Sequence, residues 1–322
     1  MNALIKRNDI KIVGLCDLST QAMDQFEKLH GITVVCKSTN LQKMIAKSGA
    51  EIIFDCTIPA AHKEVVTKAL EAGCHVLGEK PMAESMDDAR TMVQTAAASG
   101  KRYAVIQNRR YDPNIILTRK LLNQDEIGKI HTLNADFFIG PHFDGFRTQM
   151  DHVLLGDMAI HSFDQARYLL GADAVSVYAE DWNPASSWYR DGANAVAIFH
   201  MSNGTVFTYR GSWCAEGCST TWECDWRITG NKGTVLWDGT EGLSGEKVVG
   251  DSGFFRETEK LILPEKDSEQ LTSHAGVIDD FITSLDQGTR VQTECTDNIK
   301  SLAMVLAAIK SCETGKRETI HI

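Results

Sequence analysis

Two short stretches of this sequence bring together residue types that can move protons and stabilise charge. The first is GEKPMAES, residues 78–85, in which Lys80 follows a strand-like run and precedes a helix-like run. Ligands of open parallel sheets bind outside the carboxyl ends of the strands, so a lysine there could hold a substrate oxygen. Pro81 restricts Lys80 to extended backbone, which would present the lysine stiffly. The plain alternative is a solvated Lys–Glu pair in a loop.

The second stretch is GDMAIHSFDQARYLLG, residues 156–171. On a helix of about 100° per residue, four polar residues fall within about 60° of one another: Asp157, His161, Asp164 and Tyr168. The opposite side is apolar. A histidine with a carboxylate neighbour can accept a proton near neutral pH. The plain alternative is an amphipathic helix with its polar face in water.

Three further polar segments could line a cofactor or substrate cleft. TIPAAH and QNRRYDP each follow a strand-like run, and GPHFDGFRTQMDH reads as a loop long enough to reach over a cleft. All three could equally be turn, cap and connecting structure. The histidine and arginines among them hint at a polar or anionic ligand. The candidate residues are Thr57, Pro59, His62, Asn108, Arg109, His142 and Arg147.

The elements that must position these residues fall into two regions. Up to Gln107, short apolar strands alternate with helical patterns, which predicts βαβ units and a parallel sheet. Long strand-like runs then follow one another from residue 129 to 239, which predicts a largely antiparallel sheet. Helices at about 153–170, 269–287 and 296–311 would cover one face of that sheet. We therefore expect an α/β domain at 1–107 and an α+β domain at 108–322.

The first strand-like run, IKIVGLCDLS, ends at Asp17, the kind of acidic residue that holds a ribose in dinucleotide folds. The glycine fingerprint of such folds lies about 20 residues before this acidic residue. Only 16 residues precede Asp17, and no G-x-G-x-x-G occurs in the chain. We therefore expect an N-terminally truncated Rossmann domain that lacks roughly 20–30 residues, given the size of a βα unit. Such a chain should bind NAD poorly.

The composition is that of a globular protein and excludes several classes of partner. The 322 residues are 43% hydrophobic and 24% charged, with a net charge of −10 and a pI near 5.5. This acidic balance argues against nucleic acid, which needs a basic face. No apolar run is long enough to span a membrane, and the nine scattered cysteines indicate reduced thiols in a cytoplasmic protein rather than a metal site.

Taken together and in order, these segments resemble the Gfo/Idh/MocA family of NAD(P)-dependent oxidoreductases, from about Ile10 to the end of the chain. The resemblance rests on the strand ending at Asp17, TIPAAH, GEKP, QNRRYDP, GDMAIHSFD and ITGNKGTVLWDG. One departure is Ala159, where the family usually has glycine. The resemblance implies a Rossmann domain joined to an open-faced antiparallel sheet, through which copies commonly pair into dimers or tetramers.

By this resemblance, Lys80, Asp157 and His161 match the family's catalytic residues. The implied reaction is hydride transfer between nicotinamide and a secondary alcohol, typically of a sugar or cyclitol. The implied cofactor-binding set is Asp17, Thr57, Pro59, His62, Glu79, Lys80 and Asn108, and Arg109, His142 and Arg147 are candidate substrate contacts. Asp17 would repel a 2′-phosphate, and no arginine follows it at residues 18–20, so NAD is favoured over NADP.

Two other functions stay open from the sequence. The chain could be a cofactor-binding regulator, as the family's galactose-pathway repressor is, although a sensor has no need of all three catalytic residues. It could also be an inactive truncated product. Nicotinamide binding and turnover on a broad polyol panel would separate the three.

Overall fold

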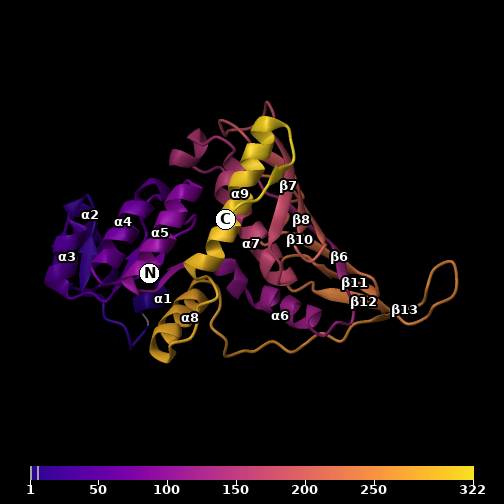
Figure 1. Cartoon of the computed structure of the whole chain (residues 1–322), viewed down its shortest axis with the longest axis horizontal. Helices are drawn as coiled ribbons and strands as arrows, with labels where there is room; N and C mark the ends of the chain where they lie inside the picture. Colours follow the sequence, from indigo (N-terminus) through magenta and orange to yellow (C-terminus); the bar gives the residue numbers. More distant parts are fainter. Residues whose placement is uncertain (1, 6) are drawn as a thin grey trace. The chain divides into compact units, whose positions relative to one another are not determined.

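A computed structural model of the chain describes residues 2–5 and 7–322. The chain divides into two compact units. Unit 1 comprises Met1–Gln107 and His274–Ile299, and unit 2 comprises Asn108–Ser273 and Lys300–Ile322. Figure 1 labels the α-helices of both units and several strands of unit 2. No helix in the described part of the chain combines the length and the apolar character that a membrane crossing requires.

Unit 1 alternates strands and helices as the sequence predicts. Its elements are α1 (Asn2–Ile5), β1 (Gly14–Cys16), α2 (Thr20–His30), β2 (Cys36–Ser38), α3 (Leu41–Ser48), β3 (Ile52–Asp55), α4 (Pro59–Glu71), β4 (His75–Gly78), α5 (Met86–Ser99) and β5 (Tyr103–Val105), joined by α8 (Ser273–Gln287). Local sequence sets the helix ends. Ser19, Asn40 and Ser85 cap helix N-termini through their side chains, and glycines with left-handed backbone follow the same helices.

The strands of unit 1 form two parallel sheets rather than one. β1 pairs with β2, and β4 lies between β3 and β5. In a doubly wound sheet of order 3-2-1-4-5-6, the strands at the positions of β1 and β3 would both border the first strand. Within the described residues, β1 pairs only with β2 and β3 only with β4, so these two edges are unpaired. The sequence predicts a strand within residues 10–19, but the observed strand β1 is shorter and has three residues.

Unit 2 is built on one nine-stranded sheet of order β13-β12-β11-β10-β6-β9-β8-β7-β14. Most neighbours are antiparallel, as predicted, while β6 and β9 run parallel. Its strands are β6 (Ile130–Phe138), β7 (Ala174–Trp182), β8 (Asn194–Met201), β9 (Val206–Ser212), β10 (Asp225–Gly230), β11 (Gly233–Trp237), β12 (Ser244–Val248), β13 (Thr258–Lys260) and β14 (Glu318–Thr319). The last three escape sequence prediction because they are short and polar.

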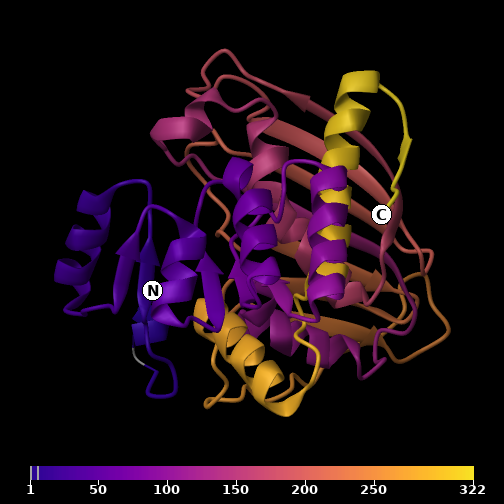
Figure 2. The ribbon, with the colours of Figure 1, turned by 60° about the vertical axis from the view of Figure 1, so that its left-hand side comes forward.

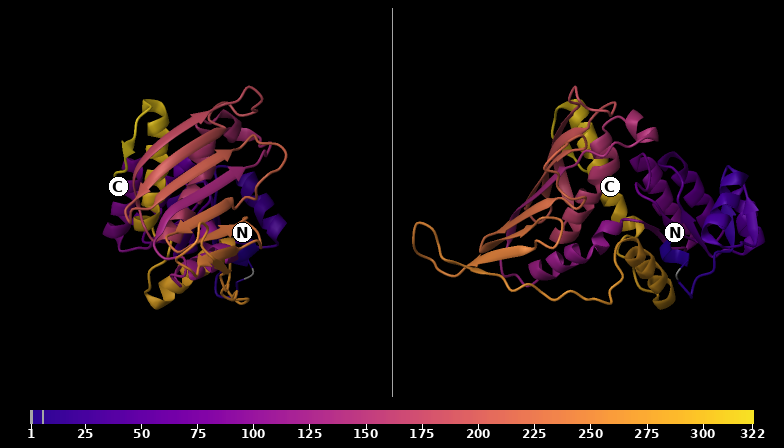
Figure 3. Two further views of the ribbon diagram at one scale, coloured as in Figure 1. Left: turned by 90° about the vertical axis from the view of Figure 1, so that its right-hand side faces the viewer. Right: turned by 180° about the vertical axis from the view of Figure 1, so that it is seen from behind.

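One face of this sheet is covered by helices and carries the core of unit 2. These helices are α6 (Pro113–Leu122), α7 (Ala159–Leu170) and the part of α9 (Cys295–Thr314) that belongs to unit 2 (Figure 2). Phe163 of α7 packs edge-on against Phe199 and Tyr209 of the sheet, with ring centroids 4.7 and 5.4 Å apart. Figure 3 shows the opposite face of the sheet, which no helix of unit 2 covers.

The domain boundary expected at 107/108 coincides with a boundary between the units, but residues 274–299 correct the prediction. They belong to unit 1, so α8 is not one of the helices of unit 2. The reason is local pairing: Val105 N–H donates to Thr293 O at 3.0 Å, and Asp279 pairs with Arg7 at 2.7 Å. Helical periodicity shows which face of α8 is apolar, but it does not show which other element that face packs against.

Candidate active site

The loops after β3 and β4 leave the same end of the sheet of unit 1, because Asp55 and Gly78 stand in register at the ends of these parallel strands. The Asp55 carboxylate accepts hydrogen bonds from the backbone N–H and the hydroxyl of Thr57, at 3.0 and 2.6 Å. Its Oδ1 thereby fixes the start of the TIPAAH segment. Thr57 itself is exposed and can contact a ligand.

The second of these loops carries Lys80. Glu79 N–H donates to Asp55 O at 2.9 Å, which prolongs the strand pairing by one step. The half-buried Lys80 follows, and the peptide bond between it and Pro81 is cis. The loop therefore leaves the sheet beside Thr57, as the sequence predicts for two neighbouring carboxyl ends.

His62 and Pro59 lie on α4, which begins at Pro59. The ring of His62 is 1% exposed, with Nδ1 2.8 Å from Pro81 O and Nε2 2.9 Å from Thr57 O. Both ring nitrogens are thus occupied by backbone carbonyls of the protein. The structure corrects the expectation that His62 contacts the cofactor directly.

Asp17 stands immediately after β1 and is exposed. Its Oδ1 accepts from the Ser19 N–H at 2.7 Å, and Ser19 in turn caps α2. This local hydrogen bond fixes the carboxylate at the carboxyl end of β1. The position suits the ribose contact expected from the sequence.

Asp157 and His161 are both buried, at 7% and 8% exposure. Asp157 lies in a short π-helical segment, Leu154–Met158, which leads directly into α7. Such π-helical turns occur frequently at functional sites. The alternative of an amphipathic helix with its polar face in water is wrong, because every polar residue from 157 to 167 is buried.

The predicted polar stripe divides between two roles. Asp164, with a fully buried side chain, accepts from Arg110 Nε and Nη2 at 2.5 and 2.7 Å and from the Ser301 hydroxyl at 2.6 Å. These bonds join η1 (Asn108–Tyr111), α7 and α9 within unit 2. Asp164 therefore belongs to a structural ion pair, and Asp157 and His161 stay the candidates of the stripe for proton chemistry.

Arg147 pairs with Asp157. It lies in the short helix η2 (Gly145–Gln149), and its Nε donates to Asp157 Oδ2 at 2.6 Å. Its guanidinium also lies 5.0 and 4.7 Å from the ring centroids of Phe143 and Phe146. Arg147 thus reaches the candidate site from the predicted loop, where it compensates the charge of Asp157.

Arg109 is mostly engaged within the protein. Its guanidinium donates to Trp222 O, lies 3.8 Å from Met158 Sδ, and has Glu223 Oε1 3.5 Å from Nε. Glu223 also accepts from Gln165 at 2.8 Å, and burial raises the pKa of its carboxyl. Arg109 and Glu223 thereby pack against the start of α7 and the turn that follows His161.

The other two residues predicted in this region lie on its surface or border. His142 is exposed, stacks on Trp188 with ring centroids 3.7 Å apart, and has Nε2 3.0 Å from Glu216 Oε1. Asn108 begins η1 and is half-buried. The structure thus places His142 against Trp188 and Glu216, whereas it places Arg147 against Asp157.

Sequence reasoning missed two carboxylates of these sites. Asp55 is 1% exposed, and its Oδ2 has no hydrogen-bond partner within the described residues. The sequence could have indicated Asp55 as a candidate, because it ends an apolar strand as Asp17 does. Glu223 gave no signal, since it stands inside the strand-like run TWECDWRITG, residues 221–230, without any motif.

These residues fit part of a dinucleotide. The exposed Asp17 carboxylate can accept ribose hydroxyls, and Asp55 Oδ2 offers an unsatisfied acceptor beside Thr57. The glycine loop that would cradle the pyrophosphate has no counterpart in the described part of the chain. The fit therefore covers the ribose position and the loops after β3 and β4.

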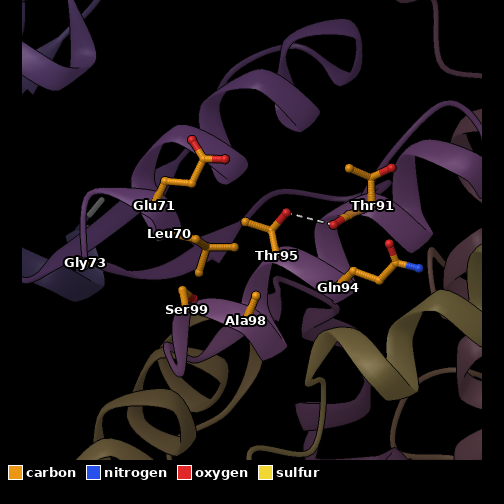
Figure 4. Close-up of a pocket in the computed structure, with 8 residues that line it drawn as sticks. All are labelled: Leu70, Glu71, Gly73, Thr91, Gln94, Thr95, Ala98 and Ser99. Atoms are coloured by element: carbon orange, nitrogen blue, oxygen red, sulfur yellow. Dashed lines mark hydrogen bonds between the residues drawn. The ribbon is translucent and has the colours of Figure 1, made fainter.

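A hollow between α4 and α5 lies apart from these loops. It is lined by Leu70, Glu71, Gly73, Thr91, Gln94, Thr95, Ala98 and Ser99 (Figure 4). Thr95 turns its hydroxyl onto the carbonyl of Thr91 at 2.9 Å. It contains none of the predicted site residues. No cluster of three or more His, Cys, Asp or Glu side chains suited to a metal ion occurs in the described ranges 2–5 and 7–322.

Comparison with known proteins assigns both parts of the chain. The sequence model described as "Oxidoreductase family, NAD-binding Rossmann fold" matches residues 1–107, and that of the GFO/IDH/MocA C-terminal domain matches residues 115–236. The chain belongs to the Gfo/Idh/MocA family. This confirms the family and the fold class predicted from the sequence, and it makes the protein a Gfo/Idh/MocA oxidoreductase.

Relatives of this Gfo/Idh/MocA oxidoreductase include an inositol 2-dehydrogenase from Rhizobium meliloti, 23% identical over 97% of this chain and 92% of that protein. A D-glucoside 3-dehydrogenase from Escherichia coli is 28% identical over 62% of each chain. The fold matches that of an Agrobacterium radiobacter oxidoreductase solved with NAD+, L-tartaric acid and magnesium. That match has a TM-score of 0.84 and 21% identity, and it covers 99% of this chain and 94% of the other.

Proposed function

We propose that the protein oxidises a secondary alcohol of a sugar, cyclitol or related polyol, or reduces the matching ketone, with NAD as the cofactor. The observation that carries this proposal is the burial of Asp157 and His161 at the π-helical start of α7. Burying polar side chains costs free energy, so a buried Asp–His pair needs a reason. In an oxidoreductase, proton transfer during the reaction would be such a reason. The dehydrogenase relatives support the same class of substrate.

NAD would be held at the carboxyl ends of the strands of unit 1. Asp17 would accept the ribose hydroxyls, and Thr57, Glu79 and the Lys80 loop would border the nicotinamide side. When bound, NAD supplies the hydride acceptor for the carbon that carries the hydroxyl. A carboxylate at position 17 disfavours the 2′-phosphate of NADP, so we expect NAD to bind more tightly.

The chain's own residues would handle the proton and the charge on oxygen. His161 would take the hydroxyl proton, with Asp157 orienting the substrate or the ring. Lys80 would place positive charge at the oxygen that becomes a carbonyl, where negative charge develops. Arg147, which donates to Asp157, would lie beside the substrate and favour polar or anionic substituents. Arg109, Asn108 and His142 are proposed as weaker contacts.

We also expect copies to assemble through the uncovered face of the nine-stranded sheet. This face exposes Trp182, Ile198 and Leu236 by 51%, 37% and 38%, and Phe138 and Trp182 line a shallow hollow on it. Exposed apolar patches of this kind mark interaction surfaces. Light scattering would show a dimer or tetramer, which Trp182→Ser should weaken. We expect this assembly in the cytoplasm.

The test is turnover of a polyol and sugar panel with NAD+, followed by NADH absorbance, in the wild type and two variants. Lys80→Ala and His161→Ala should each lower kcat by on the order of 10² or more, the effect of losing a positioned acid or base. Tyr178→Phe, a change on the uncovered sheet face, serves as the control. Near-normal turnover in both alanine variants would refute the assigned roles. NADH binding without turnover of any panel compound would indicate a regulator instead.

A further inference from the structure

His62 joins two loops that carry proposed site residues. Its ring stands between Thr57 O, on the loop after β3, and Pro81 O, on the loop after β4, at 2.9 and 2.8 Å. The side chain is 1% exposed and belongs to the first turn of α4. The ring therefore has no exposed surface for a cofactor or substrate. It contacts Pro81, the residue that follows Lys80.

The chemistry of these contacts fixes the direction of the hydrogen bonds. A backbone carbonyl only accepts, so each bond requires a proton on the ring nitrogen that faces it. A ring with one N–H satisfies one carbonyl, and a ring with two satisfies both. A side chain with two N–H donors can thus reproduce the pair of bonds, whereas an apolar side chain of similar size can reproduce neither.

Close to the sheet, strand pairing and one further backbone hydrogen bond tie the two loops together. Asp55 and Gly78 end their strands in register, and the Glu79 N–H adds one bond to Asp55 O. Beyond that point each loop needs a separate support, because strand pairing has ended. His62 supplies a bridge at this place, two residues farther along each loop.

We propose that His62 is a positioning residue that holds the Thr57 loop and the Lys80 loop in fixed relation to each other. The effect of His62 on the reaction rests on the proposed function, because it assumes that Lys80 is catalytic. Its physical consequence is independent of chemistry: without the bridge, the two loops move separately. For the reaction, a misplacement of about 1 Å at a catalytic group can lower the rate on the order of 10²-fold.

The test compares variants that differ in the number of N–H donors. His62→Leu removes both donors at similar volume, while His62→Gln retains an amide with two N–H groups. The matched control is His75→Leu, because His75 Nδ1 accepts the Arg102 N–H at 3.0 Å at the other end of β4 in the same unit. His62→Leu and His75→Leu each remove the hydrogen bonds of a buried or half-buried histidine.

The first measurement is amide hydrogen exchange at Thr57, Glu79 and Lys80 in the protein without added NAD. His62→Leu should speed exchange at these amides by tenfold or more, His62→Gln by less than threefold, and His75→Leu should leave them at the wild-type rate. Unchanged exchange in His62→Leu, or equal acceleration by Leu and Gln, would overturn the proposal. If His62→Leu does not fold, His62→Asn takes its place, since its shorter amide should free one of the two loops.

The second measurement is NADH binding and steady-state kinetics on any substrate found. His62→Leu should lower kcat at least tenfold while its KM for substrate changes less, and His62→Gln should recover most of kcat. A variant that loses melting temperature but keeps kcat and KM would show a structural role alone and overturn the proposal. If the wild type turns over nothing, the proposed reaction fails, and the exchange data still decide the role of His62.

Discussion

Replacing Asp164 by asparagine should destabilise unit 2 by far more than the same replacement at an exposed ion pair of the same geometry. Asp164→Asn keeps the size of the side chain and removes the charge that compensates Arg110. The side chains of this pair are 7% and 1% exposed, and two of its hydrogen bonds are 2.5 and 2.7 Å long. Removing one partner of a buried pair costs about 3–5 kcal/mol, because the other charge stays buried without compensation.

The matched control is Asp136→Asn on the uncovered sheet face. Arg210 also holds Asp136 by two hydrogen bonds, one of them 2.7 Å long, but these side chains are 64% and 29% exposed. Asp136→Asn and Asp164→Asn are both measured in the Trp182→Ser background, which weakens assembly through this face. Water then replaces the lost Arg210 interaction, so the cost should be about 0–1 kcal/mol. The two substitutions therefore separate burial from hydrogen-bond geometry.

Urea unfolding followed by tryptophan fluorescence measures this difference in unit 2 alone. All six tryptophans lie between residues 182 and 237, within unit 2. With a urea dependence of about 2 kcal/mol per molar, Asp164→Asn should lower the midpoint by about 1.5–2.5 M and Asp136→Asn by at most about 0.5 M. Equal shifts, or a loss under about 1 kcal/mol at Asp164, would refute the reasoning.

A double variant keeps the test informative if the single one does not fold. Arg110→Met combined with Asp164→Leu removes both charges together, and well-packed apolar replacements of a buried pair are often neutral. The double variant should therefore recover at least half of the stability that Asp164→Asn loses. Failure to recover would mean that the site depends on the Ser301 hydrogen bond or on packing more than on charge compensation.

Three further predictions follow from charges and thiols of unit 2. Arg147→Met should lower the stability of unit 2 by about 1–3 kcal/mol, since it removes the guanidinium that donates to the buried Asp157 carboxylate, and Arg147→Lys should lower it less. The hydrogen bond that His152 Nδ1 donates to Asp181 Oδ2 raises the pKa of His152 above 6.5. The stabilisation by this bond is therefore complete below about pH 6.5 and is lost as pH rises through the folded-state pKa. The urea midpoint should fall over that range in the wild type and stay flatter in His152→Gln. Burial raises the pKa of Cys224 to about 12, so at pH 8 it should react with iodoacetamide roughly 10³-fold more slowly than an ordinary thiol, while the exposed Cys218 is labelled first in a mass-spectrometric time course.

The alternation of strands and helices in unit 1 and the long strands of unit 2 could be predicted from the sequence, because apolar periodicity and glycine or polar caps act locally. The packing of α8 could not be, since its apolar face would suit either unit. The short strands β12 to β14 were missed for the opposite reason, as their residues are mostly exposed.

The candidate site divides in the same way. The strand pattern was enough to predict that Thr57, Lys80 and Asp17 follow the carboxyl ends of strands. The roles within the site depend on contacts between distant segments, which the sequence does not show. His62 bridges two carbonyls instead of facing a ligand, and Asp164 is taken by Arg110, although both residues stood in motifs that predicted chemistry. The residue-level roles in catalysis stay predictions.

The unpaired edges of β1 and β3 have a consequence for how the protein behaves in concentrated solution. Each edge presents backbone donors and acceptors that a strand from another molecule can pair with. The half of unit 1 that contains β1, β2, α2 and α3 is joined to the other half chiefly through the packing of α3 against α4. Partial opening of this junction would lengthen both edges at once, and unit 1 would then act as a seed for intermolecular sheet growth well before unit 2 unfolds.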